Sequence, residues 1–314
     1  MIATLQILVF ALSVVLVMPV PASDQQADNA NRLILVAGAT GRQGGAVARE
    51  LQRRGYRVRG LTRHAHSDRA RALIALGVEM VQGDFDDAPS LDRALDGAYG
   101  AYSVQNWRGI GAGGEIRQGE AFADAARRAG VKHFVYSSVA AAARKTGVPH
   151  FDSKVEIEAH IRAIGLPYTI IRPASFMSNL KRSRKEILAG VLRGPLPPQK
   201  KLQYIAVRDI GRFAADAFDD PDRWLGRTIE IAGDEKSNTE VAAILSRVLG
   251  RPVNYEQIPW DKFAGSAPPP IVAMVNWYRE AGFSIDVAVL RRKYPWMLTL
   301  EEYLRASGWT NQKQ

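Results

Sequence analysis

The stretch LILVAGATGRQGGAVARE at residues 33–50 constrains the fold of this chain more than any other. An apolar run, a glycine-rich turn and a segment with helical periodicity follow one another, which predicts a strand, a loop and a helix. Gly38, Gly41 and Gly44 would permit a tight turn and the close approach of a pyrophosphate, and the N-terminus of the helix favours an anion. The spacing is not the usual G-x-G-x-x-G, but the flanking strand and helix favour a phosphate-binding loop over a structural turn.

The end of the next predicted strand, over residues 56–62, indicates which dinucleotide the loop holds. An NAD site would place Asp or Glu there, against the ribose 2′-hydroxyl, whereas this chain has Thr62 and Arg63. Arg63 can pair with a 2′-phosphate, and Arg42 can assist, so we expect NADP(H) in preference to NAD(H). The alternative is that Arg63 is a solvated loop arginine. The loop residues assigned to the cofactor are Gly38, Thr40, Gly41, Arg42, Gln43 and Gly44.

The turn after the third predicted strand, residues 79–82, is a further candidate for cofactor contact. In a doubly wound sheet this turn lies beside the adenine pocket, so Asp84 can accept a hydrogen bond from the base while Phe85 packs on it. A turn aspartate and a core phenylalanine are an equally good interpretation of the residue types alone.

The composition sets outer limits on the chemistry. The chain has 314 residues, is 46% hydrophobic and 24% charged, and contains no cysteine, which excludes disulfides, thiolate metal sites and cysteine nucleophiles. Its formal charge of +10 favours acidic partners. The sequence has no block of basic residues with interleaved aromatics, so nucleic-acid binding is not expected. His64 and His66 have no accompanying ligand set, so no metal site is expected.

The first 22 residues form a separate segment. Residues 2–23 carry no charge, and they resemble a signal peptide that lacks its basic n-region. Uncleaved, the segment is just long enough to be a membrane anchor that leaves the main domain on the cytoplasmic side, and a translation start at Met18 is a third possibility. Residues 23–31 are expected to be a linker. The cytoplasmic face is favoured by the NADP(H) site, and export by a cleaved signal peptide.

Alternating strands and helices continue to about residue 172, which predicts a doubly wound parallel α/β sheet of the Rossmann type. Ligands bind outside the carboxyl ends of such strands, so the glycine loop, Arg63, Asp84, residues 105–114 and the Ser137–Ser138 pair should share one site. We expect residues 32–193 to form the cofactor domain. Residues 194–314 form a smaller α/β region for a substrate or partner, part of which returns to the first domain.

Several motifs together resemble the NmrA-like branch of the atypical short-chain dehydrogenase/reductase superfamily. They are GATGRQGG at 38–45, LTR at 61–63, QGDFDD at 82–87, VYSS at 135–138, HFDSK at 150–154 and IRPASFMSN at 171–179. The resemblance implies a Rossmann domain that prefers NADP(H) and a smaller C-terminal part that shapes a second pocket. It also implies either a redox-state sensor with a regulatory partner or a reductase of quinones or small carbonyl compounds.

The chain departs from this family at the position of the catalytic tyrosine. The superfamily carries Tyr-x-x-x-Lys, whereas here Lys154 is preceded four residues earlier by His150. Helical spacing places both on one face, where Lys154 would hold the nicotinamide ribose. A protonated His150 could donate a proton, but the nearby lysine charge favours the neutral ring. Ser137 or Ser138 could position a carbonyl group.

The loss of the tyrosine separates two main hypotheses. The leading one is an NADP(H)-binding, cofactor-responsive regulator or sensor with weak or no dehydrogenase activity. The other is an NADPH-dependent reductase of a quinone or small carbonyl compound, since quinones are reduced easily enough to dispense with the tyrosine. A third, an exported binding protein with a vestigial Rossmann domain, depends on the N-terminal segment.

Overall fold

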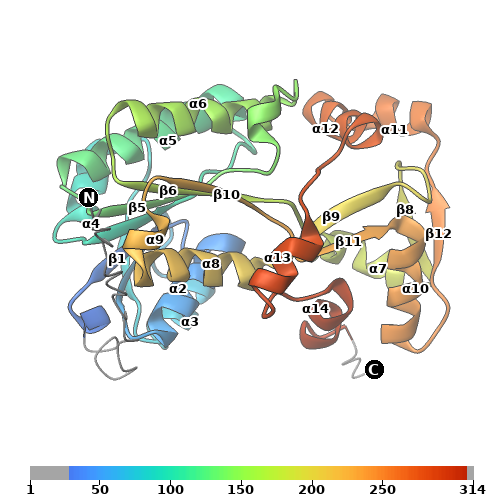
Figure 1. The fold of residues 1–314 in the computed structure, drawn as a ribbon, viewed down its shortest axis with the longest axis horizontal. Coiled ribbons are helices and arrows are strands. Elements are labelled where there is room, and N and C mark those ends of the chain that lie inside the picture. Colours follow the sequence, from blue (N-terminus) through green and yellow to red (C-terminus); the bar gives the residue numbers. More distant parts are fainter. Residues whose placement is uncertain (1–27, 310–314) are drawn as a thin grey trace, which may run out of the picture.

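A seven-stranded parallel sheet forms the centre of the structure, a computed structural model that describes residues 28–309 (Figure 1). Its strands run in the order β10-β6-β5-β4-β1-β2-β3, which is the doubly wound order with one added edge strand and confirms the predicted fold class. The strands are Leu33–Ala37 (β1), Arg57–Thr62 (β2), Glu79–Gln82 (β3), Gly100–Ser103 (β4), His133–Ser137 (β5), Tyr168–Pro173 (β6) and Arg227–Ile231 (β10).

Helices cover both faces of this sheet, so its central strands are buried on both sides and read as continuous apolar runs. One layer comprises Arg42–Arg53 (α2), Asp68–Ile74 (α3), Val207–Asp219 (α8) and Pro221–Trp224 (α9). The other comprises Ala88–Leu95 (α4), Gly111–Arg128 (α5) and Pro149–Ala163 (α6). Helices α2 and α8 pack very closely at Gly211, where an added Cβ would lie 2.8 Å from the carbonyl oxygen of Ala46.

Two helices begin earlier than the sequence pattern predicts. Helix α2 begins at Arg42, within the predicted glycine loop, because Gly44 has no side chain and can pack directly against the loop backbone. Helix α5 begins at Gly111, within the segment 105–114 that was predicted to lie at the site, because the carbonyl of Trp107 accepts hydrogen bonds from the amides of Ile110 and Gly111 and starts the turn. The part of that segment outside the helix is therefore residues 105–110.

The second region contains two small sheets and a set of short helices. The three-stranded sheet consists of Ser175–Phe176 (β7), Lys201–Ile205 (β9) and Asp234–Ser237 (β11), and the two-stranded sheet of Val191–Gly194 (β8) and Asn254–Gln257 (β12). Its α-helices are Arg184–Leu188 (α7), Asn238–Leu249 (α10), Trp260–Ser266 (α11), Pro269–Glu280 (α12), Val287–Lys293 (α13) and Leu300–Ala306 (α14). Two 3₁₀ helices are Ala142–Arg144 (η1), which precedes α6, and Met177–Ser183 (η2), which leads into α7.

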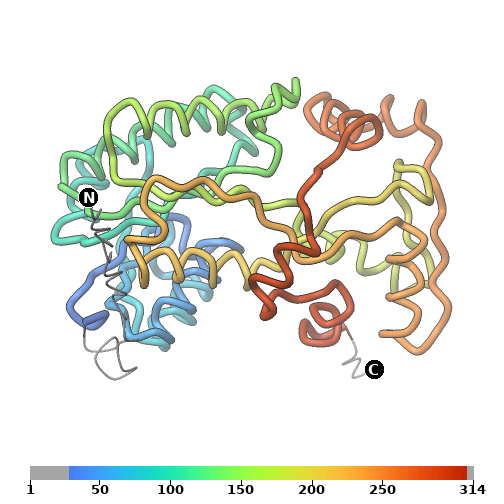
Figure 2. Tube along the Cα trace, viewed as in Figure 1, coloured from blue at the N-terminus to red at the C-terminus, as the bar shows by residue number. Residues whose placement is uncertain are grey.

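The chain crosses between the two regions more than once. It leaves the large sheet at the end of β6, so η2, α7 and β8 already belong to the second region, which is earlier than the predicted boundary at residue 193. It then returns through α8 and β10, and Figure 2 shows this gold segment running back along the first region. The returning strand is the edge partner of β6, which ties the two regions together.

The N-terminal predictions lie mostly outside the described residues, including the whole of the predicted signal peptide or anchor. Of the predicted linker, residues 28–31 are described, and they differ from a free linker. Residues 28–30 form a helical turn, and buried Asn29 donates from Nδ2 to the carbonyl of Arg54 at 3.0 Å. Within residues 28–309 no helix is both long and apolar enough to cross a membrane.

Candidate functional site

The glycine loop between β1 and α2 is shaped for a ligand that approaches the backbone. Gly38 has φ +61°, and an added Cβ on Gly44 would lie only 2.3 Å from the carbonyl oxygen of Gly38. Gly41 occupies the N-cap of α2, and no side chain of the described part of the chain caps this helix end. The first-turn N–H groups therefore face the loop, which is the arrangement that attracts phosphate.

Two predicted cofactor side chains brace the loop from the protein side. The hydroxyl groups of Thr40 and Thr62 are 3.0 Å apart, which links the loop to the end of β2. The Oε1 atom of Gln43 accepts hydrogen bonds from Ser137 Oγ at 2.7 Å and from Tyr102 OH at 3.4 Å. Thr40 and Gln43 therefore hold the loop in place. The groups of the loop that remain to contact a ligand are its backbone N–H groups and its glycines.

Arg42 links the loop to the second region. Its Nη1 donates to Ser178 Oγ at 3.1 Å and to Asn179 Oδ1 at 3.0 Å, and its guanidinium lies 5.5 Å from the centre of the Phe176 ring. Phe176 and Asn179 both line the same cavity as Arg42. The predicted phosphate-assisting arginine thus spans the cleft between the regions.

The predicted ribose and adenine residues separate into two groups. Arg63 and Asp84 line a common cavity of about 410 Å³ at the ends of β2 and β3, and Arg63 is exposed there. Phe85 instead packs edge-on against Phe122, with ring centres 5.5 Å apart, and belongs to the core beneath α4 and α5. Phe85 is only partly buried. Its packing on Phe122 is what the core alternative expects, and the base-stacking role stays a prediction.

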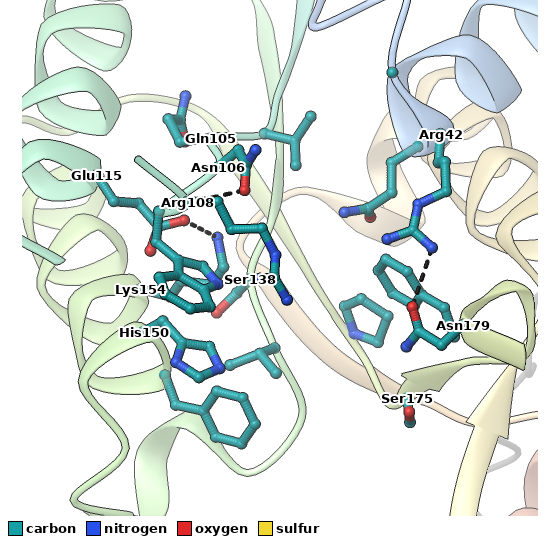
Figure 3. A pocket seen from close by; sticks show the side chains of 18 of the residues that line it. Arg42, Gln105, Asn106, Arg108, Glu115, Ser138, His150, Lys154, Ser175 and Asn179 are labelled. Carbon is teal, nitrogen blue, oxygen red and sulfur yellow. Dashed lines mark hydrogen bonds and ion pairs between the residues drawn. The ribbon is translucent and has the colours of Figure 1, made fainter. Parts of the chain in front are cut away.

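The main cavity, of about 420 Å³, lies where the two regions meet beyond the strand ends (Figure 3). It is bounded by the glycine loop, the segment after β4, helix α6, the crossing into η2 and helix α12. Its lining includes Gly38, Gly41, Arg42, Gln43, Gly44, Gln105, Asn106, Trp107, Arg108, Glu115, Ser138, His150, Phe151, Lys154, Phe176, Asn179, Arg182, Met274 and Tyr278.

Lys154 lines this cavity as predicted and is held by a buried carboxylate. Its Nζ lies 3.1 Å from Oε1 of Glu115, whose side chain is 0% exposed and also accepts a 2.6 Å hydrogen bond from Ser153 Oγ. Figure 3 shows the Lys154 and Glu115 side chains meeting between α6 and α5. Glu115 was not among the predicted site residues, although a carboxylate in a glycine-rich helix start is a signal that could have revealed it.

His150 is a neutral, stacked ring. It is 7% exposed and lies parallel to Trp107, with ring centres 4.4 Å apart and an interplanar angle of 19°. Burial, followed by the charges of Lys154 and Arg108, lowers the pKa of His150 to about 4. At neutral pH the imidazole is therefore uncharged, so the protonated form considered as a proton donor is not populated there.

The two serines at the end of β5 face different ways. Ser138 lines the cavity, whereas Ser137 is fully buried and donates to Gln43. Successive residues of an extended chain point to opposite sides, so only one of the pair can face a substrate. Ser138 is the serine that lines the cavity, with its Oγ buried, and Ser137 supports the glycine loop.

The second region supplies the outer wall of the cavity. Met274 and Tyr278 of α12 line it, and both belong to the C-terminal part that the resemblance expects to shape a second pocket. Trp277 of the same helix packs edge-on against Phe151 instead, with ring centres 5.6 Å apart. The lining residues Trp107, Arg108 and Arg182 were not predicted individually, because they come from separate loops and helix ends that no periodicity connects.

The described residues contain no group of three or more His, Cys, Asp or Glu side chains that could hold a metal ion. The cavity chemistry that they do contain is a backbone phosphate cradle, a lysine–carboxylate pair, an aromatic wall and several arginines.

A doubly wound sheet with a glycine loop at its switch point defines the class of Rossmann-type nucleotide-binding folds. The chain belongs to the NmrA-like family, whose model matches residues 30–304, as the sequence resemblance predicted.

Two relatives are enzymes and one solved relative is a regulator. A (4-alkanoyl-5-oxo-2,5-dihydrofuran-3-yl)methyl phosphate reductase of Streptomyces griseus is 34% identical, over 76% of this chain and 83% of its own. An NAD(P)H azoreductase of Xenophilus azovorans is 33% identical, over 72% and 77%. The crystal structure of NmrA, a negative transcriptional regulator, in complex with NADP has a TM-score of 0.73 at 25% identity and covers 88% of this chain and 95% of its own.

Proposed function

We propose that this chain is an NADPH-dependent reductase of a conjugated acceptor such as a quinone. The observation that carries the proposal is the 420 Å³ cavity, which is lined by the phosphate cradle and Lys154, by Trp107, and by Met274 and Tyr278 of the second region. Cavities of this size, mostly apolar and with a few convergent polar groups, are typical of small-molecule sites. The two enzyme relatives, both at least 33% identical, support a reductase rather than a pure binding role.

The residues present fit a dinucleotide. A Cβ at Gly44 would fill the space beside Gly38, and the uncapped start of α2 supplies N–H groups for a pyrophosphate. Arg63, beside Asp84 in the cavity at the ends of β2 and β3, would pair with the 2′-phosphate of NADP(H). When bound, NADPH supplies a hydride to the acceptor.

The remaining residues hold and enclose the reactants. Glu115 holds the Lys154 ammonium in place, where it can donate to a ribose hydroxyl group. Trp107, stacked on neutral His150, and Met274 present apolar surface that excludes water from the cavity. Ser138 can donate to an acceptor oxygen. Among the cavity residues that the structure describes, none takes the place of the missing tyrosine, which is why we propose an acceptor that needs little proton assistance.

A second candidate, the cofactor-responsive regulator, is favoured by the contacts of Arg42. This residue belongs to the cofactor loop, yet it donates to Ser178 and Asn179 in the second region. A dinucleotide phosphate that attracted Arg42 would compete with these contacts, and the second region would register the occupancy of the loop. The regulator in the solved complex with NADP supports this candidate.

One experiment separates the two candidates. NADPH oxidation is followed by absorbance with a panel of quinones and aldehydes, alongside calorimetric titration with NADPH alone. A reductase gives steady oxidation that depends on the acceptor and saturates with it. Tight NADPH binding without turnover on any acceptor would overturn the reductase and support the regulator.

A further inference from the structure

The main cavity carries an excess of positive charge. Its lining includes Arg42, Arg108, Arg182 and Lys154, against a single carboxylate, Glu115. That carboxylate is already used, because Lys154 Nζ lies 3.1 Å from it and Ser153 donates to it. Among residues 28–309, no ion pair is formed by any of the three arginines. The cavity therefore has three guanidinium groups without an anionic partner.

These arginines are close enough to act on one another. Partial burial, followed by the charges of Arg108 and Arg42, lowers the pKa of Arg182 from its usual range. Three cations brought together in this way repel one another, although all three side chains are exposed and water screens part of the repulsion. An anion placed among them would relieve the repulsion and form charge-assisted hydrogen bonds.

Arg108 is held at the cavity by its local structure. Its guanidinium lies 4.8 Å from the centre of the Trp107 ring, and its backbone N–H donates to Asn106 Oδ1 at 3.2 Å. Figure 3 shows Arg108 and Arg42 reaching into the cavity from opposite sides. The ring beneath Arg108 is itself stacked on His150, so the cation and the apolar wall form one surface.

Arg42 belongs to the cofactor loop, so its positive charge has a role in the proposed binding of the cofactor. Arg108 and Arg182 lie on segments that the cofactor loop does not include, after β4 and in η2. Both residues line the cavity together with the apolar side chains of Trp107, Phe151 and Met274.

We propose that Arg108 and Arg182 bind an oxyanion group of the acceptor, so that the substrate is a conjugated ring bearing a sulfonate, phosphate or carboxylate. The ring lies against Trp107 and Met274, and the anionic group lies between the two guanidinium groups. This inference deepens the proposed reductase function, since it names the substrate class of the same site. Its test is designed so that the two can fail separately.

The first arm measures binding without chemistry. Calorimetry on the full chain with saturating NADP⁺ compares naphthalene-2-sulfonate with the neutral naphthalene-2-methanol. We expect the sulfonate to bind at least tenfold more tightly. Arg108→Gln and Arg182→Gln should each remove about tenfold of its affinity, whereas the neutral ligand should bind unchanged. Arg292→Gln, which removes an exposed arginine of α13 outside the cavity, is the matched control and should bind both ligands as the parent does.

The second arm measures turnover with 1,2-naphthoquinone-4-sulfonate and 1,2-naphthoquinone. The charged quinone should have a KM about tenfold lower, and this advantage should disappear in both arginine variants. Equal KM values with good turnover would overturn the anion proposal and leave the reductase intact. Absence of turnover together with arginine-dependent sulfonate binding would overturn the reductase and leave the anion site intact.

A third reading tests whether the two arginines serve the cofactor instead. The NADPH affinity of Arg108→Gln and Arg182→Gln is measured by the same calorimetry without acceptor. The proposal expects values within about threefold of the parent. A tenfold loss of NADPH affinity in either variant would assign that arginine to a cofactor phosphate and overturn its role in acceptor binding.

Discussion

The two sides of the main cavity differ in whether backbone groups or side chains form them. The cofactor side consists of backbone: a loop whose glycines permit close approach and a helix start whose N–H groups are free of side-chain caps. The side on which we propose that the acceptor binds, called the acceptor side below, consists of side chains contributed by the segment after β4, by η2 and by α12. A site made of backbone groups tolerates little substitution and recognises the phosphate groups of its ligand. A site made of side chains can be altered by substitution, and its ligand preference can then change while the fold stays the same.

The two sides should therefore respond differently to substitution. At Gly44 an added Cβ would lie 2.3 Å from the carbonyl oxygen of Gly38, so this position admits no side chain unless the loop moves. An exposed arginine or aromatic residue on the other side can be exchanged at a cost of about 1 kcal/mol or less.

The largest expected effect comes from adding one methyl group to the backbone side. Gly44→Ala places a Cβ 2.3 Å from the carbonyl oxygen of Gly38, so the loop must move. We expect NADPH affinity to fall about a thousandfold, equivalent to about 4 kcal/mol, because the phosphate cradle is lost. Calorimetry measures the affinity, and circular dichroism establishes that the variant is folded.

The matched control is the same substitution at a glycine with free space around it. Gly113 lies in α5, and an added Cβ there meets no atom within 4 Å. Gly113→Ala should bind NADPH as the parent does and gain up to about 1 kcal/mol of stability from helix propensity. A folded Gly44→Ala that binds NADPH as tightly as the control would contradict the assignment of the loop.

The next largest effect tests the lysine that joins the two sides. Lys154→Met leaves the Glu115 carboxylate, which is 0% exposed, without its ion-pair partner. We expect the free energy of unfolding to fall by about 3 kcal/mol, the usual cost of breaking a buried pair from one side. Urea denaturation at pH 7 measures it.

The double variant Glu115→Gln with Lys154→Met distinguishes a lost pair from lost packing. It removes the stranded charge, so at least half of the lost stability should return. Lys185→Met, at an exposed lysine of α7, is the control for replacing a lysine by methionine. If the double variant is as unstable as the single one, the ion pair is not what Lys154 contributes to stability.

A smaller effect concerns the stacked imidazole on the acceptor side. Because burial lowers the pKa of His150 to about 4, the unfolded chain, with a pKa near 6.5, takes up this proton first as the pH falls. The contribution of His150 is therefore complete above pH 6.5 and is lost as the pH falls towards 4. We expect it to amount to about 2 kcal/mol between pH 7 and pH 4.5.

The measurement is the difference in unfolding free energy between the parent and His150→Gln at several pH values. The difference isolates His150, because His133, whose pKa burial also lowers to about 4, is present in both proteins. The parent should lose more stability than the variant as the pH falls. Parallel pH profiles for the two proteins would show that the imidazole is not buried in its neutral form.

The sequence predicted the backbone side far better than the side-chain side. The apolar run at residues 33–37 and the spacing of Gly38, Gly41 and Gly44 determine a strand, a turn and a helix through local sterics alone. The predicted fold class and the family resemblance follow from such local units, and both are confirmed. The first residue of α2 could not be predicted in this way, because the glycines at the start of the helix do not show helical periodicity.

The acceptor side could not be predicted in the same way. Glu115 of α5 and Lys154 of α6 are in contact although they are 39 positions apart in the chain. Arg182, in the 3₁₀ helix η2, lies near enough to Arg108 for their charges to interact. Nothing in a local pattern encodes these meetings, since they depend on how α5 and α6 pack and on where the chain crosses between the regions. For the same reason the residue types at positions 137 and 138 did not reveal which serine faces the cavity.

Arg63 tests whether a side chain can tune the backbone side. It is exposed at the end of β2 beside Asp84, so its pairing with a 2′-phosphate is partly screened by water and should be modest. Arg63→Asp should lower NADPH affinity about tenfold, or about 1.4 kcal/mol, and leave NADH affinity unchanged. Calorimetry with each cofactor measures both affinities.

Arg57→Asp, an exposed arginine at the opposite end of the same strand, carries the same charge change away from the site and should not alter the preference. Because only the 2′-phosphate distinguishes the two cofactors, a loss confined to NADPH assigns Arg63 to that phosphate. A parent protein that binds NADPH and NADH with equal affinity would contradict both the predicted preference for NADPH and the role of Arg63 in it. The glycine loop would then be the whole of the recognition on the backbone side.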